Sequence, residues 1–401
     1  MTIQMNYSKS NKITGLEEME SKGFLVPRFD YIPDFSELNM TEYDLNVNYL
    51  PEMLFELIKE KLKPFNLGNG ISVRSASFDE DSTNQSSAGR YISFNGLSDI
   101  NDIVKSAIQI WIHHRSNSKN VLCPLIIQET HPSYYSGVAF KDGDTIIIES
   151  YYGACSNIVN GSIRPYITSS VNGEVSHNYS ANSNYTYLYS VHKNVFSNPD
   201  CSIGERLFPN LEHYTYNTRL YCMENEKIML VYGNRPSSPV IHYEDKILPQ
   251  LFEILNKLDN PDGVDVEFGS DIEGNVYMYQ FRKLSRKIKG LQFNAQVQQT
   301  NSDKIFYGIT ASSGRAEGIT TSDTQLINSD SILIIENDNV DDIDILKNVK
   351  GIISYNGGIL SHLSIICREM NIPCLVGVSS PIPDGVKIFL DADNGFIKVL
   401  S

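Results

Sequence analysis

The stretch that most constrains this chain runs from Gly357 to Pro373. Before it, the apolar run 349–355 predicts a short buried strand. Gly357 and Gly358 then allow a sharp turn and a close approach of the main chain to another group, because they carry no Cβ. Ser361 is a favourable N-cap residue, and the apolar spacing after it predicts a helix that ends before the closing proline. The stretch therefore predicts a strand, a glycine turn and a helix.

His362 lies in the first turn of this predicted helix. Unpaired amide donors and the positive end of the helix dipole meet there, so a phosphoryl group is favoured at this place. A histidine in that position can itself carry the group as a covalent intermediate. The alternative is a capped helix start with an incidental histidine, and a short Gly-Gly-x-x-Ser-His motif alone favours that alternative.

The longer pattern favours the functional interpretation. Gly-Gly-x-x-Ser-His is followed by Arg-Glu-x-x-Ile-Pro and then by a Val-Gly strand. This order resembles the phosphohistidine domain of phosphoenolpyruvate-utilising enzymes and dikinases, a family that includes pyruvate phosphate dikinase, phosphoenolpyruvate synthase and rifampin phosphotransferase. The resemblance implies that His362 is the catalytic residue that carries the phosphoryl group.

Composition limits the possible classes of protein. The 401 residues are enough for two to three domains, and 41% hydrophobic with 20% charged residues is typical of a soluble globular chain. A net charge of -15 argues against a nucleic-acid partner but allows a local basic groove for ATP. No apolar run has membrane-spanning length, and the polar first residues do not resemble a signal peptide. The six scattered cysteines form no Cys-x-x-Cys pair, so we expect reduced thiols in a cytoplasmic protein without a membrane partner.

Lys12 begins a predicted helix at 12–19. Composition alone predicts a surface helix with Lys12 as a solvated charge. The segment nevertheless resembles the start of the dikinase nucleotide-binding domain, where Gly-Gly-Lys-Gly leads into a helix. Ser10, Asn11 and Ile13 replace the flanking glycines. The resemblance implies that Lys12 contacts the nucleotide.

The second block begins with a β-like run at 71–77 that contains Arg74. Small residues allow backbone amides to reach phosphate oxygens, and an arginine offers them a planar fork. A plain strand followed by a polar loop is the alternative for any one piece. Together the pieces resemble the family's Val-Arg-Ser-Ser-Ala … Glu-Asp … Ser-Phe-Ala-Gly segment. This implies that Arg74 binds the triphosphate and that Ser87, Ala88 and Gly89 form a mobile loop over it.

The run 263–282 predicts a β-hairpin. Strand alternation places Asp265 and Glu267 on one face of its first strand, and Gln280 and Arg282 on one face of its second. Such oxygen ligands suit a magnesium–triphosphate complex, although a bare hairpin with polar outward residues is the alternative. The segment resembles the Asp-Ile-Glu-Trp … Gln-x-Arg hairpin of the ATP-grasp fold. The resemblance implies Glu267 and Gln280 as metal ligands and Arg282 near the phosphates, with ATP and Mg²⁺ as cofactors.

Other segments carry less chemistry. The helical stretch 99–115 ends in His113 and His114, which we interpret as exposed residues at the helix end. Ser156 stands where the family usually has a glutamate, which makes an acidic function there doubtful. The Tyr-, Asn- and Ser-rich segment 170–235 predicts exposed strands and loops.

The predicted fold is α/β (α+β), and the resemblance covers nearly the whole chain. It implies a two-lobed ATP-grasp nucleotide-binding domain at 1–283, a polar linker at 284–305 and a small swivelling β/α phosphohistidine domain at 306–401. No domain resembling the family's phosphoenolpyruvate/pyruvate barrel is expected after it.

The leading hypothesis is an ATP-dependent phosphotransferase. By resemblance, His362 takes the β-phosphoryl of ATP, AMP and phosphate are released, and the phosphoryl group passes to a small-molecule acceptor. A ligase that uses the same phosphohistidine is the runner-up, and a phosphocarrier half-enzyme with its acceptor site on a partner protein is a third reading. A scaffold without catalysis is disfavoured, because His362, Arg74 and Glu267 are all present. We also expect the histidine domain to move on its linker between the two steps.

Overall fold

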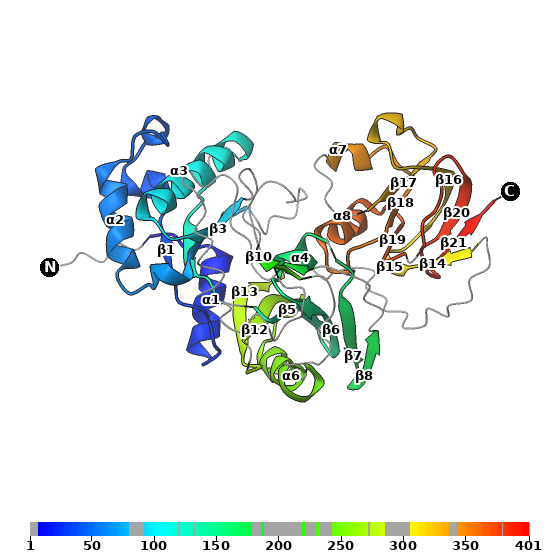
Figure 1. Cartoon of the computed structure of the whole chain (residues 1–401), viewed down its shortest axis with the longest axis horizontal. Coiled ribbons are helices and arrows are strands. Elements are labelled where there is room, and N and C mark those ends of the chain that lie inside the picture. Colours follow the sequence, from blue (N-terminus) through cyan, green and yellow to red (C-terminus); the bar gives the residue numbers. More distant parts are fainter. Residues whose placement is uncertain are drawn as a thin grey trace.

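The computed structural model describes residues 7–79, 92–118, 121–131, 133–161, 163–178, 186–187, 219–220, 230–232, 243–271, 273–284, 305–336, 343–378 and 380–400. Three main sheets follow one another from the N-terminal lobe through a central part to the C-terminal part (Figure 1). The architecture is the mixed α/β fold expected from the sequence.

The N-terminal lobe is built on a four-stranded sheet covered by two helices. Its strands in spatial order are β1 (Phe29–Ile32), β4 (Leu125–Glu129), β2 (Ile71–Ser75) and β3 (Ser93–Leu97). Its helices are α2 (Glu52–Leu62) and α3 (Ile100–Asn117), with short 3-10 turns η1 (Phe35–Leu38), η2 (Glu42–Asp44) and η3 (Leu67–Asn69). Trp111 anchors this core, since it is fully buried and its indole N–H donates to the carbonyl of Cys123 at 2.8 Å.

One prediction about this lobe was wrong. His114 is not exposed at the end of α3 but buried, with 2% of its surface accessible. Its Nε2 lies 2.8 Å from the hydroxyl of Ser77 and 3.6 Å from the carboxylate of Asp79. The last turn of α3 faces the end of β2, and a neighbouring hydroxyl and carboxylate satisfy the buried imidazole.

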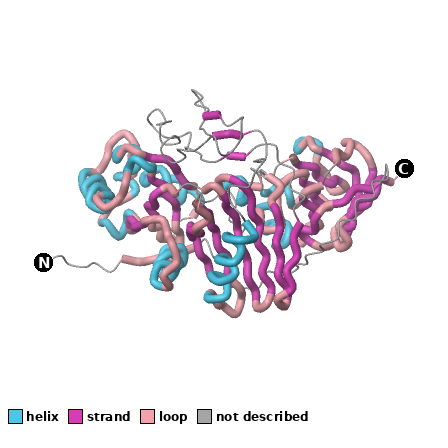
Figure 2. The backbone as a smooth tube through the Cα atoms, turned by 60° about the horizontal axis from the view of Figure 1, so that its bottom comes forward, coloured by secondary structure: helices cyan, strands magenta, loops and turns pink. Residues whose placement is uncertain are grey.

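The central part is a six-stranded sheet whose neighbouring strands lie side by side (Figure 2). The order is β13 (Val276–Lys283), β12 (Val264–Ser270), β5 (Tyr135–Asp142), β6 (Thr145–Tyr152), β7 (Tyr166–Val171) and β8 (Glu174–Asn178). Every pairing is antiparallel. The associated helices are α1 (Asn11–Ser21), α4 (Ser156–Val159), the π-helix η5 (Tyr243–Ile247) and α6 (Leu248–Lys257).

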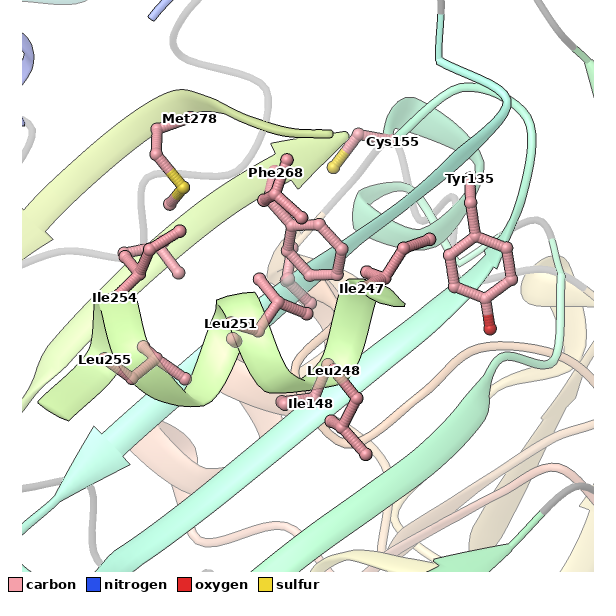
Figure 3. Close-up of a cluster of buried hydrophobic side chains, with 14 of the residues drawn as sticks. Tyr135, Ile148, Cys155, Ile247, Leu248, Leu251, Ile254, Leu255, Phe268 and Met278 are labelled. Atoms are coloured by element: carbon pink, nitrogen blue, oxygen red, sulfur yellow. The ribbon is translucent and has the colours of Figure 1, made fainter. Parts of the chain in front are cut away.

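The two faces of the central sheet have different partners. The apolar side of α6 packs on one face, where Leu251 and Leu255 lie close to Ile148, Phe268 and Met278 (Figure 3). Because side chains alternate along a strand, the neighbours of Ile148 on β6 point to the other face. That face is covered at β6 and β7 by the C-terminal part.

The C-terminal part is an eight-stranded sheet. Its order is β14 (Ile305–Tyr307), β21 (Phe396–Val399), β20 (Lys387–Asp391), β16 (Arg315–Thr321), β17 (Ser331–Ile335), β18 (Gly351–Ser354), β19 (Cys374–Val376) and β15 (Ile309–Ser312). The helices are α7 (Ile343–Leu346) and α8 (His362–Met370), with the 3-10 turn η6 (Thr324–Leu326). Strands β16 to β19 are parallel, and α8 connects β18 to β19.

The glycine-led stretch folds as the sequence predicts. Ser361 is the N-cap of α8, and its side chain accepts a hydrogen bond from the N–H of Ser364. The helix ends at Met370, and its C-cap residue Asn371 adopts the left-handed conformation with a φ of 54°. A strand lies on either side, as predicted.

Short strands β9 (Thr186–Tyr187), β11 (Leu230–Tyr232) and β10 (Arg219–Leu220) form a further sheet. The predicted loop residues Ser87, Ala88 and Gly89, and the predicted linker between 285 and 304, lie outside the described residues. Among the described helices, none combines the length and apolar character needed to cross a membrane.

Candidate active site

The hairpin of β12 and β13 presents the predicted polar residues on one face of the central sheet. Glu267 pairs with Gln280, and Asp265 pairs with Arg282. Directly paired residues point to the same face, so all four side chains share it. A bulge follows Glu267, and it places one extra residue, Tyr279, between the two parts of the register.

Arg74 reaches this face from β2 of the N-terminal lobe. Its Nη2 lies 3.3 Å from Oε2 of Glu267 and 3.4 Å from Oε1 of Gln280. Nη2 of Arg282 lies 2.6 Å from Oδ2 of Asp265. The structure thus brings together residues that are 193 and 206 positions apart in sequence.

The two predicted metal ligands converge on one point. Oxygens of Glu267 and Gln280 both contact the same guanidinium nitrogen of Arg74, so they are directed toward a common cation position. Hard oxygen donors of this kind fit Mg²⁺, which usually completes its octahedron with water and phosphate oxygens. Within the described residues, no group of three or more His, Cys, Asp and Glu side chains is arranged to hold a metal alone. The residues therefore fit a magnesium ion that is shared with a triphosphate.

Lys12 approaches the same region from the first turn of α1. This helix packs against β13, and Gly15 permits the contact because a Cβ there would overlap the carbonyl oxygen of Phe281. Lys12 lies close enough to His362 that its charge lowers the pKa of that histidine.

His362 is the first residue of α8 and faces this group of charges across the boundary between the two parts. Its side chain is exposed, yet the crowding of protein around the ring disfavours the charged imidazolium and lowers the pKa of His362. Glu267 and Asp265 act in the opposite direction, while Arg282 and Lys12 add to the lowering. A lowered pKa keeps the imidazole neutral near pH 7, and the neutral form is the nucleophile.

Two residues that connect the parts were not predicted from the sequence. Glu149 on β6 is fully buried, and its carboxylate accepts hydrogen bonds from the main chain just before α8. Arg164 donates to two carbonyls of the C-terminal part. A single carboxylate after three isoleucines in a buried strand was the available sign for Glu149.

Ser156 begins the short helix α4, and its side chain is exposed. The position offers a hydroxyl where the family resemblance leads one to expect an acid.

Comparison with known proteins agrees with this architecture. The model of the pyruvate phosphate dikinase AMP/ATP-binding domain matches residues 47–303, and the model of the mobile domain of PEP-utilising enzymes matches residues 327–395. The first match contains β2 and the β12–β13 hairpin, and the second contains His362.

Individual relatives are named phosphoenolpyruvate synthase or rifampicin phosphotransferase. Phosphoenolpyruvate synthase of Aeropyrum pernix is 23% identical over 368 residues, which cover 82% of this chain and 44% of the relative. Phosphoenolpyruvate synthase of Pyrococcus furiosus is 22% identical over 384 residues, covering 87% and 44%. Rifampicin phosphotransferase of Bacillus subtilis is 25% identical over 171 residues, covering 40% and 20%. The chain thus spans less than half the length of these relatives.

The dikinase AMP/ATP-binding model covers more than half of the chain, and the mobile-domain model follows it in the family's order. The chain therefore belongs to the family of phosphoenolpyruvate-utilising enzymes and dikinases, a family of ATP-binding transferases, and combines an ATP-grasp-type domain with the family's mobile domain.

Proposed function

We propose that this chain transfers a phosphoryl group from ATP to His362 and then to an acceptor. The observation that carries the proposal is the position of His362, which faces Glu267, Arg282 and Lys12 across the domain boundary. The names of the relatives, a synthase that forms phosphoenolpyruvate and a phosphotransferase, support phosphoryl transfer in general.

The proposed chemistry assigns each residue a task. A neutral ring nitrogen of His362 attacks the β-phosphorus of ATP, an N–P bond forms, and the bond from that phosphorus to the α-phosphate oxygen breaks to release AMP. Water then removes the γ-phosphoryl group as phosphate, which leaves phospho-His362. Arg74, Arg282 and Lys12 bind and neutralise phosphate oxygens, and fixed positive groups of this kind stabilise the transferring phosphoryl group. Glu267 and Gln280 would hold Mg²⁺, which supplies further charge neutralisation on the triphosphate.

The second step passes the phosphoryl group to a small-molecule acceptor. One histidine cannot stay against ATP and also meet an acceptor while water is excluded from both reactions, so we propose that the C-terminal domain leaves the nucleotide domain between the steps. Domain boundaries at 1–283, 284–305 and 306–401 suit this motion. A ligase that uses the same phosphohistidine, or an acceptor site on a partner protein, remains the second candidate.

Nucleotide product analysis tests the proposal. The protein is incubated with ATP and Mg²⁺, with and without candidate acceptors, and the nucleotides are separated by chromatography. AMP and phosphate in equal amounts are expected, and His362→Ala should form neither. ADP as the nucleotide product would contradict the dikinase route and indicate ordinary kinase chemistry.

A further inference from the structure

The boundary between the two domains contains a buried carboxylate. Glu149 extends from β6 of the nucleotide domain, and none of its surface is exposed. Its Oε1 accepts from the N–H of Ile359 at 2.5 Å, and its Oε2 accepts from the N–H of Leu360 at 3.0 Å. Successive main-chain N–H groups form a concave site for an anion, and hydrogen bonds to a carboxylate are stronger than those to a neutral acceptor.

The glycine loop is shaped to receive this carboxylate. A Cβ at Gly358 would overlap both oxygens of Glu149, whose carboxylate supplies the three nearest atoms. On the far side of the same loop, Nη1 of Arg368 donates to the carbonyl of Ile359 at 2.7 Å. The peptide between Ile359 and Leu360 is therefore held from both sides, by an anion at its N–H and by a cation at its carbonyl.

A second charged residue makes similar contacts nearby. Nη2 of Arg164 donates to the carbonyls of Tyr355 at 3.2 Å and Val378 at 3.0 Å. These carbonyls follow β18 and β19, the strands on either side of α8 in sequence. The carbonyl of Ile163 also accepts from the N–H of Gly357 at 3.0 Å. Two charged side chains of one domain thus bind the main chain of the other.

The sheet register links Glu149 to the nucleotide site. Glu149 pairs with Val138, and Val138 pairs with Glu267, so all three point to one face. Adjacent strands lie about 4.8 Å apart, which places Glu149 and Glu267 roughly 10 Å from each other on one rigid sheet. His362 follows the bound loop by two residues. A single row of paired residues therefore sets the histidine loop at one end and the proposed metal ligands at the other.

Apolar packing supports the same arrangement. Ile147 and Ile167 of the central sheet belong to one buried cluster with Ile359 and Leu363 of the C-terminal domain. Apolar contact of this kind is not directional, whereas the hydrogen bonds of Glu149 define one position of the loop. The apolar cluster supplies contact area, and the carboxylate fixes the position of the loop.

We propose that Glu149 is a positioning residue for His362: it binds the N–H groups of Ile359 and Leu360, and it thereby aligns the imidazole with the nucleotide site in the docked state. This inference rests on the proposed function for its effect on rate, but the contact itself can be tested without catalysis. A carboxylate that served only the stability of the nucleotide domain would affect ATP binding and unfolding, whereas a positioning residue affects the transfer to His362.

The first experiment measures phosphoryl transfer in the full chain. Rapid-quench kinetics with β-labelled ATP give the rate of His362 labelling, and calorimetry gives the dissociation constant for the nucleotide. Glu149→Gln should slow labelling by about tenfold or more, because a side-chain amide places a donor against a main-chain N–H. The ATP dissociation constant should change less than about twofold, since Glu149 lies away from the phosphate-binding residues. An unchanged labelling rate would overturn the inference and leave the proposed function standing.

A double-mutant cycle tests the contact from the other domain. Gly358→Ala should slow labelling as strongly as Glu149→Gln does, because its Cβ excludes the carboxylate. In a Glu149→Ala background the same change should have little further effect, since the overlapping atoms are gone. Fully additive effects would show that Gly358 and Glu149 do not act through this contact, and would overturn the inference.

Amide hydrogen exchange provides a measurement independent of activity. The N–H groups of Ile359 and Leu360 should exchange at least about tenfold faster in Glu149→Gln than in the parent chain, while the N–H of Ser364, which is bonded within its own domain, should be unaffected. If the parent chain forms no phosphohistidine but exchange at Ile359 and Leu360 is still faster in Glu149→Gln, the proposed function fails and the contact stands. If the N–H groups of Ile359 and Leu360 exchange at the same rates in Glu149→Gln as in the parent chain, the proposed contact is wrong.

Discussion

In the central sheet, Glu267 and Glu149 lie on either side of Val138 in one row of paired residues, and the two carboxylates have different surroundings. Glu267 keeps 17% of its side chain exposed and pairs with the side chain of Arg74. Glu149 has none exposed and accepts hydrogen bonds from main-chain N–H groups of the other domain. One carboxylate is open to exchange of partners, and the other is enclosed.

The difference follows from what each end has to do. A partly solvated ion pair contributes little to stability, so the partners of Glu267 can be exchanged for a metal and phosphate at small cost. A protein is strongly destabilised when a buried carboxylate loses its partners, unless water reaches that carboxylate. Glu149 can therefore change partners only when the domains separate and solvent enters. The nucleotide end is suited to ligand exchange, and the interface end to two discrete states.

The largest effects are expected at the nucleotide end, around Glu267. Replacing Arg74 by Ala would remove the charge-assisted contact that we propose to the triphosphate, and the change should cost about 2–4 kcal/mol in the transition state. Glu267→Gln should raise the Mg²⁺ concentration required for half-maximal labelling of His362. Rapid-quench labelling across a magnesium titration measures both.

A matched control is the exposed Arg315, which pairs with Asp391 and Asp393 on the C-terminal domain. Arg315→Ala should leave labelling unchanged. If Arg74→Ala and Glu267→Gln both slow the labelling of His362 by less than about tenfold, the ATP site is misplaced on this face.

A smaller effect is expected at the interface end, around Glu149 and Arg164. Arg164→Met keeps the length and apolar stem of the side chain but leaves the carbonyls of Tyr355 and Val378 without this donor. Labelling of His362 should slow by roughly tenfold, because the docked state loses hydrogen bonds from a charged group. The exposed Arg28 provides the control, since Arg28→Met should have no effect. Weaker ATP binding in Arg164→Met, with an unchanged labelling step, would place Arg164 in the nucleotide site instead.

The pH dependence of labelling should change by a still smaller amount. The pKa of His362 is lowered, so the neutral nucleophile persists below its ordinary value of 6.5, and labelling should fall only at more acidic pH. Lys12 contributes to the lowering, so Lys12→Met should raise the pKa of His362. The acidic limb of the curve of labelling rate against pH should then move to higher pH. NMR titration of the imidazole checks the direction. A downward movement in Lys12→Met would show that Lys12 does not act on His362 in the docked state.

The smallest effect lies in the N-terminal lobe, away from both ends. Burial lowers the pKa of His114, so the unfolded chain binds the proton more tightly and stability should decrease as pH falls through about 6.5. His114→Asn should weaken this dependence in the melting temperature between pH 7 and pH 5. His113→Asn, at the preceding residue, is the matched control. An equal pH dependence in the parent and in His114→Asn would contradict the assignment.

The sequence was informative where local rules decide the structure. A cap residue and apolar spacing predicted α8, and strand alternation predicted the shared face of the β12–β13 hairpin. His114 was predicted wrongly because the same spacing does not show which side of a helix end another strand will cover.

Glu149 and Arg164 were missed for a different reason. Their partners lie 210 and 191 positions away, and no local pattern relates a strand in one domain to a turn in another. A glycine before a histidine helix explained a close approach, but not which group approaches. The interface is a property of the docked domains, and only the three-dimensional arrangement identifies it.

The central claim is that His362 receives the β-phosphoryl group while docked near Glu267 and Arg282. Its most direct test is incubation with β-labelled ATP and Mg²⁺, followed by peptide mapping of the trapped enzyme. Acid-labile, base-stable label on His362 is predicted, with none on His362→Ala and with ATP still bound by that variant. Stable labelling of His362→Ala, or label from the γ-position alone on the parent chain, would contradict the account.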